Sequence, residues 1–192
     1  MDQIIEKSLE DSISVKRQFI LDNLQRIKET AMIIAETFRS GGKLLLFGNG
    51  GSAADAQHIA AEFVNRFLIE REPLPAVALT TDTSILTSIA NDYSFEDVFS
   101  KQVKALGRRG DVVLGITTSG NSPNVIKALE TAKGIEIKTV VLTGRDGGKV
   151  AQIVDIPLIV SSIKVPRIQE AHGFCGHVLC ELVDHILFQG PH

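Results

Sequence analysis

Short, uninterrupted apolar runs that alternate with helical segments constrain the fold of this chain more than any other feature. The runs follow residue 42 and lie at 43–47, 76–79, 111–116, 138–142 and 155–160. Continuous apolar runs of this length are typical of strands buried on both faces of a parallel sheet. Helical patterns separate the runs and follow the last one, at about 52–68, 83–90 with 95–106, 122–133, 147–152 and 166–187.

This alternation predicts right-handed βαβ crossovers and an α/β fold, a three-layer αβα sandwich around a five-stranded parallel sheet. Residues 4–38 lack Gly and Pro and carry apolar residues at helical spacing, so residues 1–40 are expected to add one or two N-terminal helices. We expect a single domain over 1–188. The terminal LFQGPH resembles the remnant of a protease site added for expression, so residues 187–192 carry no functional argument and 189–192 are expected as the remnant.

Composition excludes several classes of protein. The net charge of −3 and the pI of about 6.0 give no field that attracts nucleic acid or an anionic membrane, so neither is expected as a partner. No signal-peptide pattern and no apolar run long enough for a membrane span is found, so a cytoplasmic location is expected. Cys175 and Cys180 would point in different directions on one helix and are expected as buried hydrophobes rather than as a disulfide.

A glycine-rich loop, GNGGS at 48–52, follows the first predicted strand. Glycine lets the backbone turn sharply and approach a ligand, and the next helix offers free N–H groups to an anion. Ser52 is expected as the N-cap of that helix. The loop also matches the dinucleotide pattern GxGxxA, but the first acidic candidate for the ribose, Asp82, lies too far along the chain. No nucleotide cofactor is therefore expected.

A second loop, rich in hydroxyl groups, follows the third predicted strand. Thr117, Thr118, Ser119 and Ser122 precede a helix that begins at Pro123, a residue favoured at the first helical position. Backbone N–H groups and hydroxyls can satisfy phosphate oxygens without a lysine, and a plain helix cap needs only one hydroxyl. The loop is therefore predicted to bind phosphate. Neither loop matches the nucleoside triphosphate pattern GxxxxGK[ST].

The chemically reactive candidates lie on two helices. His58 and Glu62 are separated by one helical turn, so they project from one face, and their alanine-rich surroundings predict a buried carboxylate. Gln169 and His177 lie on the final predicted helix, about 12 Å apart along its axis. For His177 considered alone, an ordinary core or surface histidine is the default interpretation. Together with His58 and Glu62 it would complete a zinc set, which this spacing allows but does not require.

Several motifs resemble the phosphoheptose isomerases of the sugar isomerase (SIS) domain family. They are GNGGSAADAQHIAAE at 48–62, TTDTS at 80–84, AND at 90–92, TTSGNSPNV at 117–125, LTGRDGG at 142–148 and RIQEAH at 167–172. The resemblance implies a flavodoxin-like SIS domain that converts sedoheptulose 7-phosphate, a phosphorylated seven-carbon sugar, to D-glycero-D-manno-heptose 7-phosphate. This reaction begins the synthesis of ADP-heptose for the lipopolysaccharide core. The resemblance further implies a homotetramer with active sites at subunit interfaces, and one zinc ion per subunit.

The resemblance also assigns roles to individual residues. Glu62 matches the catalytic carboxylate and His177 the catalytic imidazole. The matches to zinc ligands are His58, Glu62, Gln169 and His177. The matches to substrate-binding residues are Asn49, Gly50, Gly51, Glu62, Asn91, Asp92, Thr117, Thr118, Ser119, Ser122 and Gln169. Gly173 and Gly176 stand where relatives carry bulkier apolar residues, so they are expected to loosen the helix that positions His177.

Aldose–ketose isomerisation moves a proton between C1 and C2 through an enediol, which requires a base above the carbons and an acid near the oxygens. Glu62 is the expected base and His177 the expected acid. If zinc takes both residues as ligands, metal binding and proton transfer must compete or alternate, and the sequence leaves this open. An alternative is a non-catalytic SIS-domain adaptor that binds a replication initiator, and a third is a sugar-phosphate sensor. Both would be expected to lack Glu62 or His177, so the presence of both favours the enzyme.

Overall fold

Five parallel strands form the central sheet, in the order β2-β1-β3-β4-β5. The computed structural model describes residues 1–190, so residues 191 and 192 of the predicted remnant at 189–192 lie outside the described part. The strands are β1 Leu44–Gly48, β2 Ala76–Ala78, β3 Val112–Thr117, β4 Lys138–Gly144 and β5 Ile156–Val160. The predicted five-stranded parallel sheet is confirmed. Its order reverses between β1 and β3, where ligands bind in folds of this kind.

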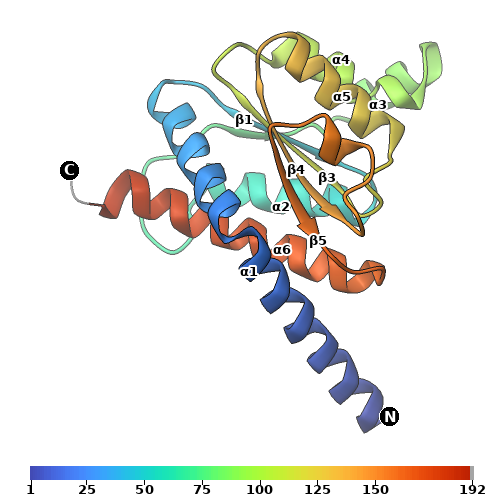
Figure 1. The fold of residues 1–192 in the computed structure, drawn as a ribbon. Helices are drawn as coiled ribbons and strands as arrows, with labels where there is room; N and C mark the ends of the chain where they lie inside the picture. Colours follow the sequence, from blue (N-terminus) through green and yellow to red (C-terminus); the bar gives the residue numbers. More distant parts are fainter. Residues whose placement is uncertain (191–192) are drawn as a thin grey trace.

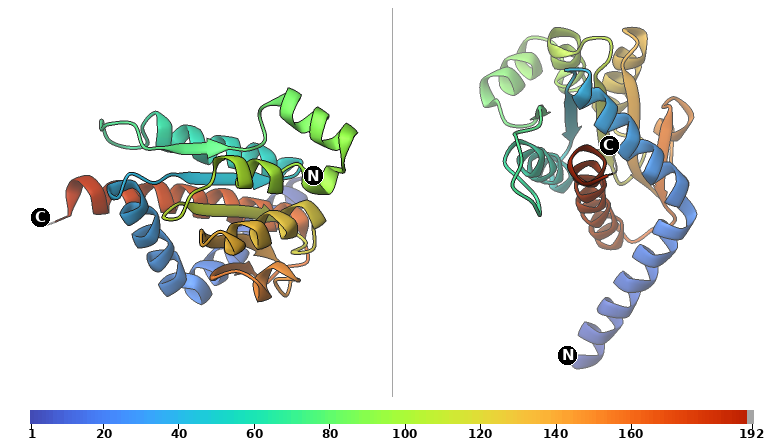
Figure 2. Two further views of the ribbon diagram at one scale, coloured as in Figure 1. Left: turned by 90° about the horizontal axis from the view of Figure 1, so that it is seen from above. Right: turned by 90° about the vertical axis from the view of Figure 1, so that its left-hand side faces the viewer.

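Helices cover both faces of the sheet. They are α1 Asp2–Arg39, α2 Gly51–Val64, α3 Thr83–Asp92, α4 Ser100–Leu106, α5 Pro123–Gly134 and α6 Val165–Asp184, with short turns of other helix types at Phe95–Asp97, Val150–Gln152 and His185–Gln189. Helices α1, α2 and α6 lie on one face, and α4 and α5 lie on the other (Figures 1 and 2). Successive side chains of a strand point to opposite faces of the sheet. In β1, Leu44 and Leu46 pack toward α1, α2 and α6, whereas Leu45 packs toward α4 and α5. This confirms the three-layer sandwich.

Helix α1 forms one continuous helix instead of two. Residues 1–10 are exposed and project from the body of the molecule, with the N-terminus at the bottom of Figure 1. Farther along, Phe19, Ile27 and Ile34 are buried in the core shared with α6 and β5. The C-terminal two thirds of α1 therefore belong to the domain itself.

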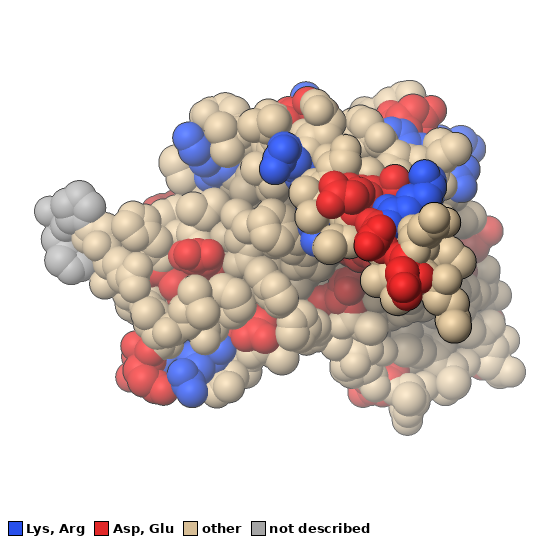
Figure 3. Space-filling model, turned by 90° about the horizontal axis from the view of Figure 1, so that it is seen from below, with Lys and Arg blue, Asp and Glu red and all other residues tan. Residues whose placement is uncertain are grey.

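An apolar groove of about 510 Å³ lies between α1 and α6. Its apolar lining consists of Ile13, Ile20, Leu21, Leu24, Ile27, Phe174, Val178 and Leu182. Leu21 is 65% exposed and Leu24 is 48% exposed. Figure 3 shows the molecule from below as mostly uncharged surface with scattered charged side chains, the densest group of which lies at the right of the view.

Gly176 lies where α6 packs on α2. A Cβ at this position would stand 2.6 Å from Cδ1 of the buried Ile59, so a larger residue would require Ile59 or the helix to shift. Helix α6 runs without a break from Val165 to Asp184. Packing against α1 and α2 accompanies this unbroken helix, and the loosening expected from the low helix propensity of Gly173 and Gly176 stays a prediction.

The structure bears on two predictions from the sequence, one on the cysteines and one on membrane-spanning helices. Cys175 and Cys180 are free and buried, as predicted, and burial raises the pKa of the Cys175 thiol to about 12. Within residues 1–190, every helix is too short or too polar to cross a membrane.

Candidate active site

The two predicted ligand loops lie side by side at the carboxyl ends of the neighbouring strands β1 and β3. The side-chain amides of Asn49 and Asn124 join them through two reciprocal hydrogen bonds of 2.9 Å each. Asn124 is 2% exposed and lies in the first turn of α5. The sequence analysis did not single out Asn124, although a buried amide directly after a hydroxyl-rich loop was the available signal. Asn49 thus fixes the glycine loop against the predicted phosphate loop.

The predicted phosphate loop gathers its hydroxyl groups in front of α5. The Thr117 hydroxyl lies 3.0 Å from that of Ser122 and 3.5 Å from that of Ser119. Ser122 is the N-cap residue of α5, and its hydroxyl faces Thr117. Thr118 is half-buried beside them. Such a group of hydroxyls at a helix N-terminus suits a phosphate, since the free backbone N–H groups there favour an anion.

The LTGRDGG segment, residues 142–148, and the residues just after it pack against the predicted phosphate loop. Gly120 has a φ of 68°, and a Cβ there would collide with the carbonyl oxygen of Gly147 in the LTGRDGG segment. The Val150 N–H donates to the Gly120 carbonyl at 3.1 Å, and the Lys149 N–H donates to the Asn121 side chain at 3.2 Å. The close backbone approach explains why glycine is needed at position 120.

Ser52 does not cap α2 as predicted. The N-cap is Gly50, which has a φ of 55°, and Ser52 is a buried residue of the first turn. The positive φ turns the chain at Gly50, so the helix begins two residues earlier than it would with Ser52 as the N-cap.

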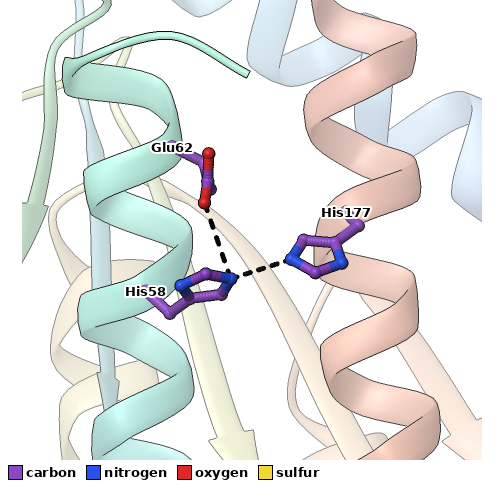
Figure 4. Close-up of side chains that lie close together, drawn as sticks. All are labelled: His58, Glu62 and His177. Atoms are coloured by element: carbon purple, nitrogen blue, oxygen red, sulfur yellow. Dashed lines mark hydrogen bonds and ion pairs between the residues drawn. The ribbon is translucent and has the colours of Figure 1, made fainter. Parts of the chain in front are cut away.

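His58, Glu62 and His177 converge between α2 and α6 (Figure 4). Nε2 of His58 lies 2.8 Å from Nε2 of His177 and 3.6 Å from Oε1 of Glu62. One donor atom from each residue lies within 4.8 Å of those from the other two. The Phe67 ring stacks on the imidazole of His177 at a centroid distance of 5.4 Å and restricts its orientation. The structure thus answers the question that spacing left open: His177 belongs to the same cluster as His58 and Glu62.

The Glu62 side chain is 24% exposed, so its carboxylate is partly rather than fully buried. The alanine-rich residues around it, including Ala56 and Ala60, face the sheet, whereas His58 and Glu62 face the space beside α6. The carboxylate is therefore accessible to a ligand.

The donor set fits a divalent metal. Two imidazole nitrogens and one carboxylate oxygen form a common zinc set, and ligand atoms around a tetrahedral zinc ion lie about 3.3 Å apart. Two of the three separations, 2.8 and 3.6 Å, bracket that value, and the third, between Glu62 and His177, is within 4.8 Å. The cluster therefore has both the chemistry and the spacing to hold zinc with only small side-chain adjustments.

Gln169 lies against the other end of α2. A Cβ at Gly51 would collide with the amide nitrogen of Gln169, so this side chain reaches the glycine loop. His177 lies about 12 Å farther along α6. In this structure Gln169 lies beside Gly51 of the glycine loop, and its roles as a substrate contact and as a fourth zinc ligand stay predictions.

Asn91 and Asp92 end helix α3, where the Asn91 amide donates to the Asp92 carboxylate at 2.9 Å. Every residue of α3 is at least partly exposed. The predicted contacts of these two residues with substrate stay predictions.

His172 lies outside the cluster although it belongs to the same motif as Gln169. It is fully buried, and its Nε2 lies 3.2 Å from the Thr143 carbonyl oxygen. Burial lowers the pKa of His172 to about 4, so the ring is neutral and links α6 to β4.

Comparisons with known proteins agree with this geometry. The SIS domain family model matches residues 9–144. The phosphoheptose isomerase of Thermodesulfovibrio yellowstonii is 56% identical over 187 residues, covering 97% of this chain and 93% of that protein. That of Aquifex aeolicus is 56% identical over 183 residues, covering 95% and 96%.

Solved structures give the same result. Phosphoheptose isomerase GmhA from Neisseria gonorrhoeae matches with a TM-score of 0.90 and 45% identity, covering 95% of this chain and 98% of that one. A phosphoheptose isomerase from Francisella tularensis matches with a TM-score of 0.91 and 39% identity, covering 95% and 97%. The similarity extends over nearly the whole chain and includes α6, which carries His177. This chain belongs to the SIS-domain family and, within it, to the phosphoheptose isomerases.

Proposed function

We propose that this protein is an aldose–ketose isomerase that converts sedoheptulose 7-phosphate to D-glycero-D-manno-heptose 7-phosphate, the first step toward ADP-heptose. The observation that carries the proposal is the convergence of Glu62, His58 and His177. The same chain places several hydroxyl groups close together at the start of α5. The two parts serve the two ends of a phosphosugar. We take residues 1–188 as one SIS domain, with 1–40 as its N-terminal helical segment.

In the proposed mechanism, Glu62 takes the proton from C1 of the ketose while the oxygen on C2 gains a proton from His177. The resulting enediol then accepts the proton from Glu62 at C2, and His177 recovers the proton from the oxygen on C1. His58, 3.6 Å from Glu62, orients the carboxylate. The phosphate at residues 117–122 supplies binding energy remote from the reacting carbons. A zinc ion held by His58, Glu62 and His177, with Gln169 as a further candidate, would supply Lewis acidity toward the sugar oxygens.

The direct test is incubation of the protein with sedoheptulose 7-phosphate in D₂O, followed by NMR. We expect an aldose C1 signal to appear and deuterium to enter at C2, because the carboxylate exchanges its proton with solvent. Binding of the sugar phosphate without aldose formation or deuterium exchange would contradict the isomerase and support the adaptor or sensor. The presence of Glu62, His58 and His177 in one cluster argues against both alternatives.

We further propose one zinc ion per subunit. Replacing His58 by alanine should weaken zinc binding at least about tenfold, because the change removes one donor of the set without leaving a large buried cavity. Metal analysis of both proteins, before and after chelator treatment, measures this. His185→Ala is the matched control, since His185 is exposed and lies outside the cluster. A metal-free wild type with full activity, unchanged by added zinc, would leave His58 as a residue that only orients Glu62.

The protein is also proposed to form a homotetramer with its active sites at subunit interfaces. The groove between α1 and α6 supports this, because its lining is mainly apolar, with Lys16, Arg17 and Lys28 among it, and exposed apolar patches are typical of contact surfaces. Leu21→Glu combined with Leu24→Glu should lower the mass found by light scattering, whereas Leu106→Glu in α4 should not. Removing residues 1–38 would be a poorer test, since it would also remove Phe19, Ile27 and Ile34 from the core. A tetramer that survives the double substitution would exclude this groove from the interface.

A further inference from the structure

Arg71 is a buried arginine in the loop that joins α2 to β2. Its side chain is 1% exposed, although the loop lies on the surface. Its Nε donates to Oδ1 of Asp184 at 2.7 Å, and Asp184 is itself only 5% exposed. A buried guanidinium is costly unless all of its donors are used, so a structural reason for its position is required.

The remaining donors of Arg71 bind the end of α2. Nη2 donates to the Glu62 carbonyl at 2.9 Å, and Nη1 donates to the Phe63 carbonyl at 2.7 Å. The last carbonyls of a helix lack partners within the helix, and a positive charge there is favourable. Glu62 lies in this last turn, which ends at Val64. Arg71 therefore holds the stretch of backbone from which the Glu62 side chain projects.

Asp184 connects the same guanidinium to α6. It lies two helical turns after His177, so both side chains project from the same face of α6. Among the described residues the buried Oδ2 of Asp184 finds no hydrogen-bond partner, which leaves the bond to Arg71 as the main compensation for its charge.

We propose that the Arg71–Asp184 pair is a positioning device that sets the relative placement of α2 and α6, and with it the approach of Glu62 to His177. The contacts between these helices form a series along their length: Gly51 with Gln169, Ile59 with Gly176, and His58 with His177. The Arg71–Asp184 pair adds a further contact at the C-terminal ends of α2 and α6. Its catalytic consequence rests on the proposed isomerase function, whereas its structural consequence does not.

The catalytic test is Arg71→Lys, which keeps the charge but loses the fork that reaches Asp184 and two carbonyls together. We expect kcat to fall about 10–100-fold, since a misplacement near 1 Å can cost ~10²-fold. KM should change less than about threefold. The predicted phosphate loop joins β3 to α5, so a shift between α2 and α6 leaves it in place. Asp184→Asn, which keeps the shape and removes the charge, should show the same split between kcat and KM.

The matched control is Asp111→Asn. Asp111 is 3% exposed and pairs with Lys43 at 2.7 Å, at the amino ends of β1 and β3, the edge opposite the site. This variant should lose stability and keep kcat. An equal fall of kcat in Asp111→Asn and Arg71→Lys, measured well below both unfolding temperatures, would reduce the Arg71 effect to general stability and overturn the proposal.

A second measurement needs no substrate. The ¹⁵N imidazole resonances of His58 and His177 should shift in Arg71→Lys and stay unchanged in Asp111→Asn. Unchanged resonances in Arg71→Lys would overturn the positioning role even in an active enzyme. A wild type without isomerase activity would refute the proposed function. The histidine resonances alone would then decide whether the Arg71–Asp184 pair positions the two histidines.

Discussion

Replacing Glu62 by glutamine is expected to lower the turnover of sedoheptulose 7-phosphate by about 10²–10⁴-fold, the usual contribution of a general base. The amide keeps the shape of the side chain but cannot accept the proton from C1. Affinity for the sugar phosphate should stay largely intact, because the phosphate is proposed to bind at residues 117–122, away from Glu62. Steady-state kinetics and a binding measurement on the same preparation separate the two effects.

The control for this variant is Glu130→Gln, an exposed glutamate on α5 that should leave turnover unchanged. Metal content should be measured alongside, since Glu62 is also a proposed zinc ligand. If Glu62→Gln retains more than about a tenth of wild-type turnover, the base must be another residue, because general-base catalysis contributes at least ~10²-fold.

The double substitution Ser119→Ala with Ser122→Ala should raise KM for the sugar phosphate about 100-fold or more. A hydrogen bond to a charged group contributes roughly 1.5–3 kcal/mol, and two such bonds are lost. Both hydroxyls lie within 3.5 Å of the Thr117 hydroxyl at the start of α5, so one phosphate can reach all three. The change in kcat should be smaller, since the reacting carbons lie near Glu62.

Thr131→Ala is the control, because its hydroxyl donates to the Lys127 carbonyl within α5 and lies far from the loop. Kinetics across a wide range of substrate concentration distinguish KM from kcat. An unchanged KM in the double variant would place the phosphate outside the 117–122 loop.

Most of the fold could be predicted because its determinants are local. Each strand is a short apolar run, and each ligand loop follows such a run with glycine or hydroxyl residues. The pairing of His58 with Glu62 follows from helix geometry alone. The predicted helix over 95–106 was less accurate: a short turn at Phe95–Asp97 precedes α4, and the Ser94 hydroxyl caps that turn by accepting from the Glu96 N–H.

The sequence by itself thus determined the parallel sheet, the two ligand loops and one half of the reactive cluster. Only the tertiary structure decided that His177 meets His58 across 119 positions and that Arg71 meets Asp184 across 113. These contacts depend on how closely α6 packs on α2, which in turn depends on the space left beside Ile59 by the missing side chain of Gly176. Hydrophobic periodicity specifies which face of a helix is buried, but it does not specify the neighbour or the depth of contact, because many partners satisfy an apolar face equally well.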